Sequence, residues 1–84
     1  MNDTELPKDL QKMKNNRRDW TMDEIILLSR NFDIEHRTTN GSHHVFSHNL
    51  IRNNLSIPNH KDIHPKYIGK LVRFIEEILN FKKK

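Results

Sequence analysis

The chain contains no cysteine, only two glycines and only three prolines among its 84 residues. The lack of cysteine excludes disulfides, thiolate zinc sites and cysteine nucleophiles. Two glycines are too few for a glycine-rich phosphate-binding loop. No apolar run approaches the length of a signal peptide or a membrane span, so we expect a cytoplasmic protein without membrane contact. Among the ionisable residues, the six histidines are the main candidates for chemistry.

The composition predicts one small, strongly polar and basic domain. Apolar residues make up 33% of the chain, and the formal net charge is +4 with histidine neutral. A positive charge of this size favours a phosphate-bearing partner, although solubility alone is also a sufficient reason for it. The cations cluster only in part, near the two ends of the chain: Lys8, Lys12, Lys14, Arg17 and Arg18, then Lys82, Lys83 and Lys84.

Residues 1–18 are interpreted as a charged extension, flexible or loosely helical, that precedes a domain over residues 19–84. Pro7 can open a short helix that the polar stretch after Lys14 would end. This extension is either a basic arm for RNA or a solvated tail.

A helix is predicted from Met22 to Arg30. Thr21 and Glu24 have the spacing of a capping box, in which each side chain bonds the backbone of the other residue. Asn31 is expected to end the helix in the left-handed conformation.

Alternation of apolar and polar residues predicts three strands after this helix. Asn-Gly is the typical pair of a tight two-residue hairpin turn. The expected segments are a strand over 32–38, a turn at Asn40 and Gly41, a strand over 43–48, a longer turn over 49–53, and a strand over 54–57 ended by Pro58. On the middle strand His43, Val45 and Ser47 face one side, and His44, Phe46 and His48 face the other. Which side is the core stays open.

A last helix is predicted from Pro65, because proline suits the first turn and a wide apolar stripe follows at helical spacing. Tyr67, Phe74 and Phe81 form a second, aromatic row that either widens the core or contacts a partner protein. The order helix, three strands, helix predicts a small two-layer α+β domain with an antiparallel sheet and both helices on one face.

The histidines allow the chemistry of a metal-independent ribonuclease. Such an enzyme needs a base for the 2′-hydroxyl proton and an acid for the leaving 5′-oxygen, and imidazole serves as either. His43 lies at the hairpin, where a substrate can approach. The second group is His60, His64 or a bound water, and cationic side chains would stabilise the transition-state charge.

A metal site has little support in the sequence. His44 and His48 lie about 13 Å apart along a strand. His60 and His64 flank a loop, and no HExxH pattern is present. We therefore expect no metal and no cofactor.

The segment Gly41-Ser42-His43-His44-Val45-Phe46 resembles the Gly-Ser-His-x-x-aromatic signature of the HicA family, the toxins of HicBA toxin–antitoxin modules. A second similarity is the segment Ile57-Pro58-Asn59-His60, followed by Ile63-His64-Pro65 and an amphipathic helix. The resemblance covers roughly residues 20 to 80. The chain departs from the family pattern at Asn49–Arg52, where a Pro- and Gly-bearing turn is common, and at Asn31, where glycine is usual.

This resemblance implies a fold like that of double-stranded-RNA-binding domains. It implies an mRNA interferase that cleaves mRNA, blocks translation and is neutralised by a HicB-type antitoxin, in a hetero-oligomer. His43 is then the catalytic histidine, and Gly41 and Ser42 shape the turn and donate to a phosphate. The residues expected to contact the RNA substrate are Gly41, Ser42, His44, His60, Lys61 and Lys66.

Two other hypotheses stay open. One is a non-catalytic RNA-binding module that recognises A-form shape and gives His43 no special role. The other is a protein-interaction domain that docks a partner on the aromatic row. An antitoxin is expected to cover the basic face and His43, because blocking substrate access is the simplest inhibition.

Overall fold

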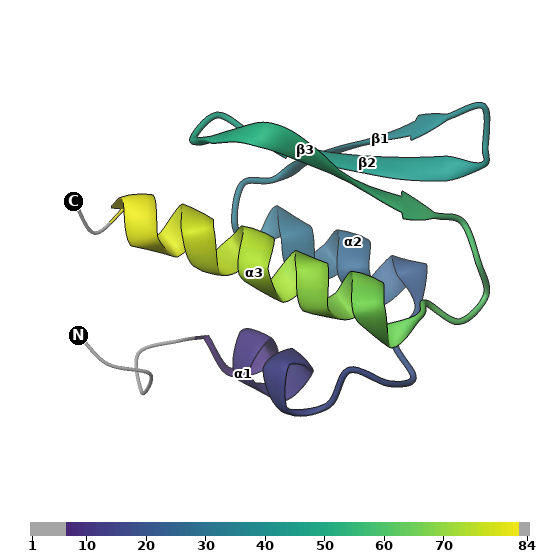
Figure 1. Ribbon diagram of the computed structural model, residues 1–84, viewed down its shortest axis with the longest axis horizontal. Coiled ribbons are helices and arrows are strands. Elements are labelled where there is room, and N and C mark those ends of the chain that lie inside the picture. The colour runs from purple at the N-terminus through teal and green to yellow at the C-terminus, as the bar shows by residue number, and fades with distance from the viewer. Residues whose placement is uncertain (1–6, 83–84) are drawn as a thin grey trace.

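The protein is an α+β domain in which helices cover one face of a three-stranded antiparallel sheet (Figure 1). The computed structural model describes residues 7–82. Its elements are α1 (Lys8–Asn15), α2 (Met22–Arg30), β1 (Glu35–Thr39), β2 (His43–His48), β3 (Ile51–Pro58) and α3 (Pro65–Lys82). The strands lie in the order β1-β2-β3. The predicted sequence of helix, three strands and helix is confirmed, with α1 added in front of it. Among the described helices, none combines the length and apolar character that a membrane span requires.

The elements stack in layers, with the sheet on top, α2 and α3 beneath it, and α1 below α3 (Figure 1). α3 contacts β3, α2 contacts β1, and α1 contacts α3. The other face of the sheet is not covered by any element of residues 7–82 (Figure 1). The core therefore lies between the sheet and the helices, and one sheet face is open to solvent.

The buried side chains settle which face of β2 is the core. Phe46 is fully buried and Ile57 of β3 is buried beside it, whereas His43 is exposed. Side chains alternate along a strand, so His44 and His48 share the inner face with Phe46. His43, Val45 and Ser47 lie on the outer face.

The capping box of α2 is confirmed. The Thr21 hydroxyl accepts from the Glu24 backbone N–H at 3.3 Å, and Glu24 Oε1 accepts from the Thr21 N–H at 2.9 Å. The expected left-handed Asn31 is wrong, because Asn31 is right-handed at φ −68°. Asp33 is left-handed instead, at φ 59°. Its N–H bonds Arg30 O and the Ile34 N–H bonds Ser29 O, the paired bonds of a Schellman ending.

The largest differences from the predicted strand boundaries are at the starts of β1 and β3. β1 starts at Glu35, since the residues before it belong to the turn that closes α2. β3 starts at Ile51 and β2 ends at His48, so the turn between them is the two residues Asn49 and Leu50. The Leu50 N–H donates to His48 Nδ1 at 3.0 Å and closes this turn. The polar run after it is a bulge within β3, where Arg52–Asn54 oppose Ser47 alone.

α1 agrees with the short helix that Pro7 was expected to open, but its packing differs from the expected flexible or loosely helical extension. Leu10 and Met13, three residues apart on one face of this helix, are fully buried. Lys14 Nζ lies 2.8 Å from Glu76 Oε2 of α3. Two apolar residues are too few to define an amphipathic pattern, and only the packing on α3 explains their burial. Residues 1–6 of the predicted extension lie outside the described residues.

We expect Leu10→Ala to lower the free energy of unfolding by about 2–5 kcal/mol, the usual cost of removing a buried leucine side chain. Lys12→Ala, on the exposed face of the same helix, is the matched control and is expected to change it little. Urea denaturation followed by circular dichroism measures both. Equal stability of Leu10→Ala and Lys12→Ala would show that residues 8–15 do not contribute to the core in solution.

Candidate active site

The turn between β1 and β2 is held in a conformation that its residues favour. Asn40 has φ 51° and Gly41 has φ 74°, and the Ser42 N–H donates to Thr39 O at 3.0 Å. Asparagine and glycine tolerate positive φ, which other residues rarely adopt. Thr39 pairs with His43, so three residues lie between the paired positions, one more than in the predicted two-residue turn.

His43 begins β2 on the outer face of the sheet and is exposed. Its Nδ1 lies 3.3 Å from the Ser42 hydroxyl oxygen. That hydroxyl donates its own proton to Thr39 O at 3.2 Å, so it accepts from His43 Nδ1–H. This arrangement favours the Nδ1–H tautomer of His43. Nε2 then carries the lone pair, and no bond from residues 7–82 occupies it. An exposed imidazole nitrogen in this state can accept a proton from a bound ligand.

Ser42 orients His43 and has no donor left for a phosphate. Its backbone N–H and its hydroxyl both donate to Thr39 O. The predicted donation from Ser42 to substrate therefore requires these bonds to open first.

Asn59 ties the end of β3 to the hairpin turn. Its backbone N–H donates to Ser42 O at 3.0 Å, and its side-chain Nδ2 donates to Gly41 O at 3.1 Å. Asn59 is not among the predicted site residues, although it lies within the segment that carries the family resemblance. Only the register of β3 on β2, in which Pro58 pairs with His43, brings it to the turn.

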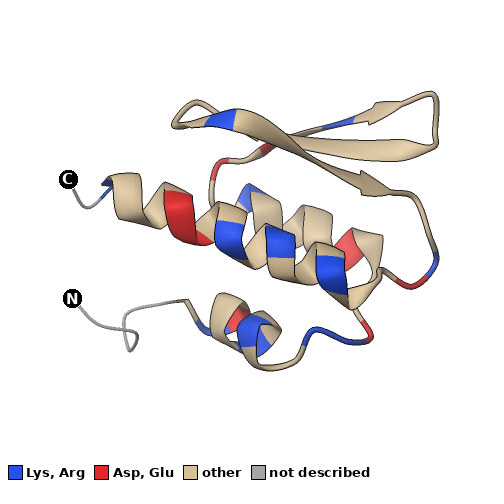
Figure 2. Cartoon of the chain, in the orientation of Figure 1, with Lys and Arg blue, Asp and Glu red and all other residues tan. Residues whose placement is uncertain are grey.

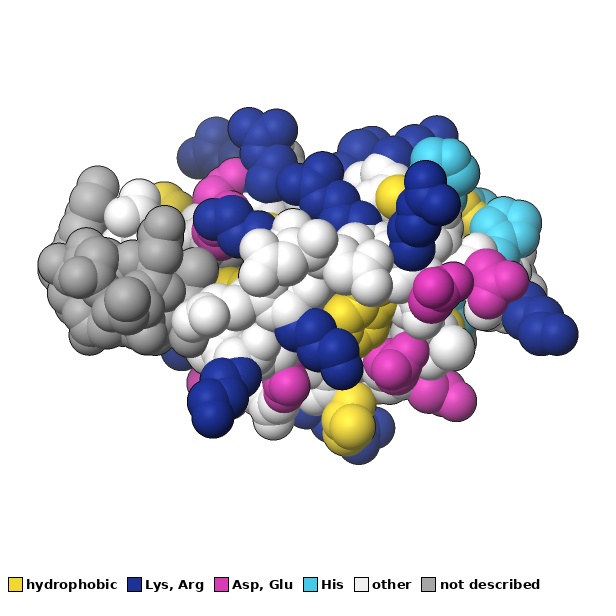
Figure 3. All heavy atoms as spheres, turned by 90° about the horizontal axis from the view of Figure 1, so that it is seen from below, with side chains coloured by type: hydrophobic (Ala, Val, Ile, Leu, Met, Phe, Trp, Pro, Cys, Tyr) yellow, Lys and Arg dark blue, Asp and Glu magenta, His cyan; other side chains and the backbone are white. Residues whose placement is uncertain are grey.

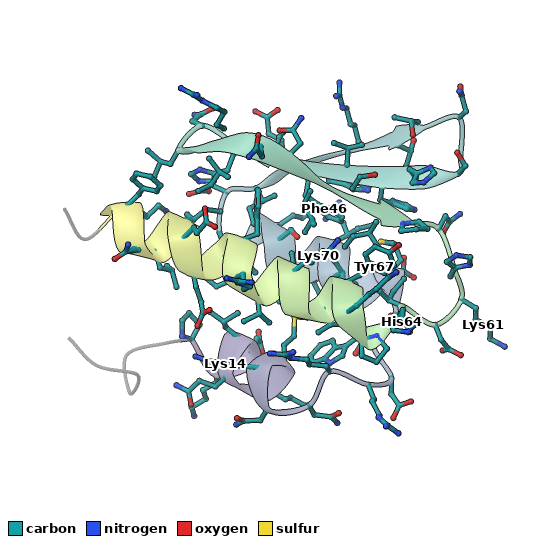
Figure 4. All side chains as sticks on the ribbon, viewed as in Figure 1. Lys14, Phe46, Lys61, His64, Tyr67 and Lys70 are labelled. Carbon is teal, nitrogen blue, oxygen red and sulfur yellow. The ribbon has the colours of Figure 1, made fainter. Side chains whose placement is uncertain are left out.

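The Asn59 contact brings the connector between β3 and α3 to the end of the molecule that holds His43. His60 and Lys61 follow Asn59 directly and are both exposed. The hairpin and the connector lie at the same end in Figure 1, and Figure 4 labels Lys61 on this connector. Histidine side chains also gather at this end in the view from below (Figure 3). The structure thus places Gly41, Ser42, His43, His60 and Lys61 in one region.

His44 is separated from this region, since it lies on the inner face of the sheet. Its Nδ1 is 2.6 Å from Nε2 of His36 on β1, and the two rings stack with centroids 4.9 Å apart. The His36 ring also lies 5.1 Å from that of Phe46. The sequence showed His36 only as a member of an alternating strand, and the cross-strand diagonal that joins it to His44 depends on the register.

Three further residues have local partners outside the hairpin. His64 Nδ1 accepts from the Lys66 N–H at 3.1 Å, which caps the start of α3. Lys66 Nζ lies 5.1 Å from the centre of the Tyr67 ring. His48 closes the turn between β2 and β3. Of the histidines considered for catalysis, His43 and His60 are therefore exposed at the same end of the molecule without a capping role.

Burial lowers the pKa of His36, and the nearby His44 and Arg30 lower it further. At neutral pH the His36 ring is therefore uncharged, and one of the two histidine rings donates an N–H to the other. Protonation of both rings would remove the acceptor and break the bond.

Comparisons of the chain with protein-family models, curated proteins and solved structures find no match. In residues 7–82 no group of three or more His, Cys, Asp or Glu side chains is placed to hold a metal ion. The function therefore has to be argued from the fold and from the geometry of the hairpin.

We expect the protein to lose stability as the pH falls through about 6.5, the ordinary pKa of histidine. His36 has a lowered pKa when folded, so the unfolded chain takes up its proton first and unfolding becomes easier at lower pH. Urea denaturation at about pH 7.5 and about pH 5.5 measures this loss. His36→Gln should reduce the difference between the two pH values, and the exposed His60→Gln should retain it. An unchanged pH dependence in His36→Gln would contradict this assignment.

Proposed function

We propose that the chain is a metal-independent endoribonuclease that cleaves mRNA, the toxin of a HicBA-like toxin–antitoxin pair. The observation that carries the proposal is the environment of His43. The residue is exposed at the start of β2, and the Ser42 hydroxyl on its Nδ1 leaves Nε2 open as a base. The order of α2, the three strands and α3 agrees with the fold that the HicA resemblance implies.

The proposed reaction is an internal transesterification of RNA. His43 Nε2 takes the proton of a 2′-hydroxyl, and the resulting oxygen attacks the adjacent phosphorus. The bond from phosphorus to the 5′-oxygen breaks, and that oxygen receives a proton from His60 or from water. The products are a 2′,3′-cyclic phosphate and a free 5′-hydroxyl, which balances protons and charge. Exposed Lys61, next to His60, supplies positive charge for the phosphate in the transition state.

Substrate approaches in this scheme from the open face of the sheet. Arg37 on β1 pairs with Val45 and shares the outer face with His43, so it adds a cation that was not among the predicted site residues. His44 faces the helices and has no substrate contact in this scheme. A HicB-type antitoxin that covers the outer face and the connector would exclude RNA, and an mRNA substrate places the pair in the cytoplasm.

A non-catalytic RNA-binding module is the second candidate. The observation that favours it is a row of exposed cations, Lys66, Lys70 and Arg73, along α3 (Figure 2). Such a module would bind RNA with strong salt dependence and without strand scission.

We expect His43→Ala to lower the cleavage rate of a long single-stranded RNA in EDTA by at least about 100-fold, the usual size of a general-base contribution. The substitution removes an exposed side chain, so the fold should persist by circular dichroism. The products of the wild type should end in a cyclic phosphate.

His48→Asn is the matched control, because it removes an imidazole at the other end of β2 and keeps an acceptor for the Leu50 N–H. It should cleave RNA at the wild-type rate. Wild-type cleavage by His43→Ala would reject the proposed role. Binding of RNA without cleavage by the wild type would favour the second candidate.

A further inference from the structure

A groove of about 630 Å³ lies between β3 and α3. It lies at the end of the sheet where His48 pairs with Ile51, and His43 pairs with Pro58 at the opposite end. Phe74 lies along it and is buried, whereas Leu50 and Phe81 are 41% and 49% exposed at its border. The groove thus offers apolar surface at a distance from the proposed active site.

The charged residues of the groove are mostly cationic. Arg52 comes from β3, Lys70 and Arg73 come from α3, and Glu77 is the one carboxylate of the lining. Figure 2 shows basic bands on β3 and on α3, the two elements that line the groove. Among the described residues, none of these cations lies in an ion pair, in contrast to Lys14 and Lys82. The groove therefore has excess positive charge around an apolar floor.

The shape of β3 favours contact through side chains over the addition of a fourth strand. The bulge at Arg52–Asn54 lies along this groove, and a bulge interrupts the regular row of N–H and C=O groups that strand addition needs. A segment that enters the groove would meet the Phe74 and Phe81 rings and the three cations.

We propose that this groove docks a segment of a partner protein that carries carboxylates around large apolar side chains. The apolar side chains bury against Phe74 and Phe81, and the carboxylates lie against Arg52, Lys70 and Arg73. A second copy of the chain has the same excess positive charge here and is repelled. RNA fits less well, since the aliphatic side chains of Leu50, Ile51 and Leu55 suit the apolar side chains of a peptide and give a sugar–phosphate backbone no partner. The proposal goes beyond the ribonuclease activity and does not depend on it.

The test is selection of a library of random short peptides on the immobilised full chain. We expect enrichment of peptides that combine Asp or Glu with Leu, Phe or Trp. Fluorescence anisotropy of a resynthesised peptide should show at least about tenfold weaker binding to Lys70→Glu/Arg73→Glu, because the charge reversal replaces attraction by repulsion. Phe81→Ala should also weaken binding.

Three control variants make the result specific to the groove. Lys12→Glu changes an exposed cation of α1, and Leu27→Ala changes an apolar residue of α2 that is 64% exposed. Both should bind the peptide as the wild type does. His43→Ala should also bind it normally, which separates this result from the outcome of the ribonuclease test.

Other outcomes overturn the proposal. If oligouridylate binds, the Lys70→Glu/Arg73→Glu variant loses that binding and no acidic peptide is enriched, the groove is an RNA site. If the wild type dimerises in sedimentation and Phe81→Ala does not, a second copy occupies the groove. The proposal is also rejected if no peptide is enriched, or if the groove variants bind the enriched peptide as tightly as the wild type does.

Discussion

The burial of Phe46 determines how every other side chain of β2 is oriented. Side chains alternate along a strand, so an inward Phe46 requires an inward His44 and an outward His43. The two adjacent histidines therefore have different environments. His44 is part of a half-buried stacked pair with His36, whereas His43 is exposed beside the hairpin turn. The burial of Phe46 thus places the His36–His44 pair on the inner face of the sheet and His43, the candidate catalytic residue, on the outer face.

The same constraint gives Asn59 its importance. Once β2 and β3 are in register, the chain leaving β3 passes the hairpin turn, and Asn59 bonds two of its carbonyls. The turn is fixed from one side by the positive φ values of Asn40 and Gly41, and from the other by this connector. Because the turn is fixed on both sides, the adjacent His43 loses little conformational freedom when a ligand binds. The contact of Asn59 with the turn also brings His60 to the end of the molecule that holds His43.

Local patterns predicted the elements that depend on neighbouring residues. Thr21 and Glu24 identified the start of α2, and Pro65 identified the start of α3, because caps and first turns are determined within a few residues. The errors over residues 8–15 and 52–54 concern features that depend on distant packing. The burial of Leu10 and Met13 requires α3, and the polar run Arg52–Asn54 resembles a turn unless its position opposite Ser47 is known.

The candidate site was predictable in part for the same reason. Gly41, Ser42 and His43 are consecutive, so their association follows from the sequence. The contact of Asn59 with the turn, and the pairing of His36 with His44, join residues on different strands and require the register. The placement of His44 on the opposite sheet face from His43 also depends on which face of the sheet is buried.

The most direct test of this account is an NMR titration of the six histidine side chains with a 2′-O-methyl oligoribonucleotide, which lacks the attacking hydroxyl and remains intact. Each imidazole gives its own nitrogen signals, so all six report at once. The account predicts that the signals of His43 and His60 shift together along one binding curve, and that those of His36, His44 and His48 stay in place. Shifts of the His36 and His44 signals with an unchanged His43 signal would contradict it.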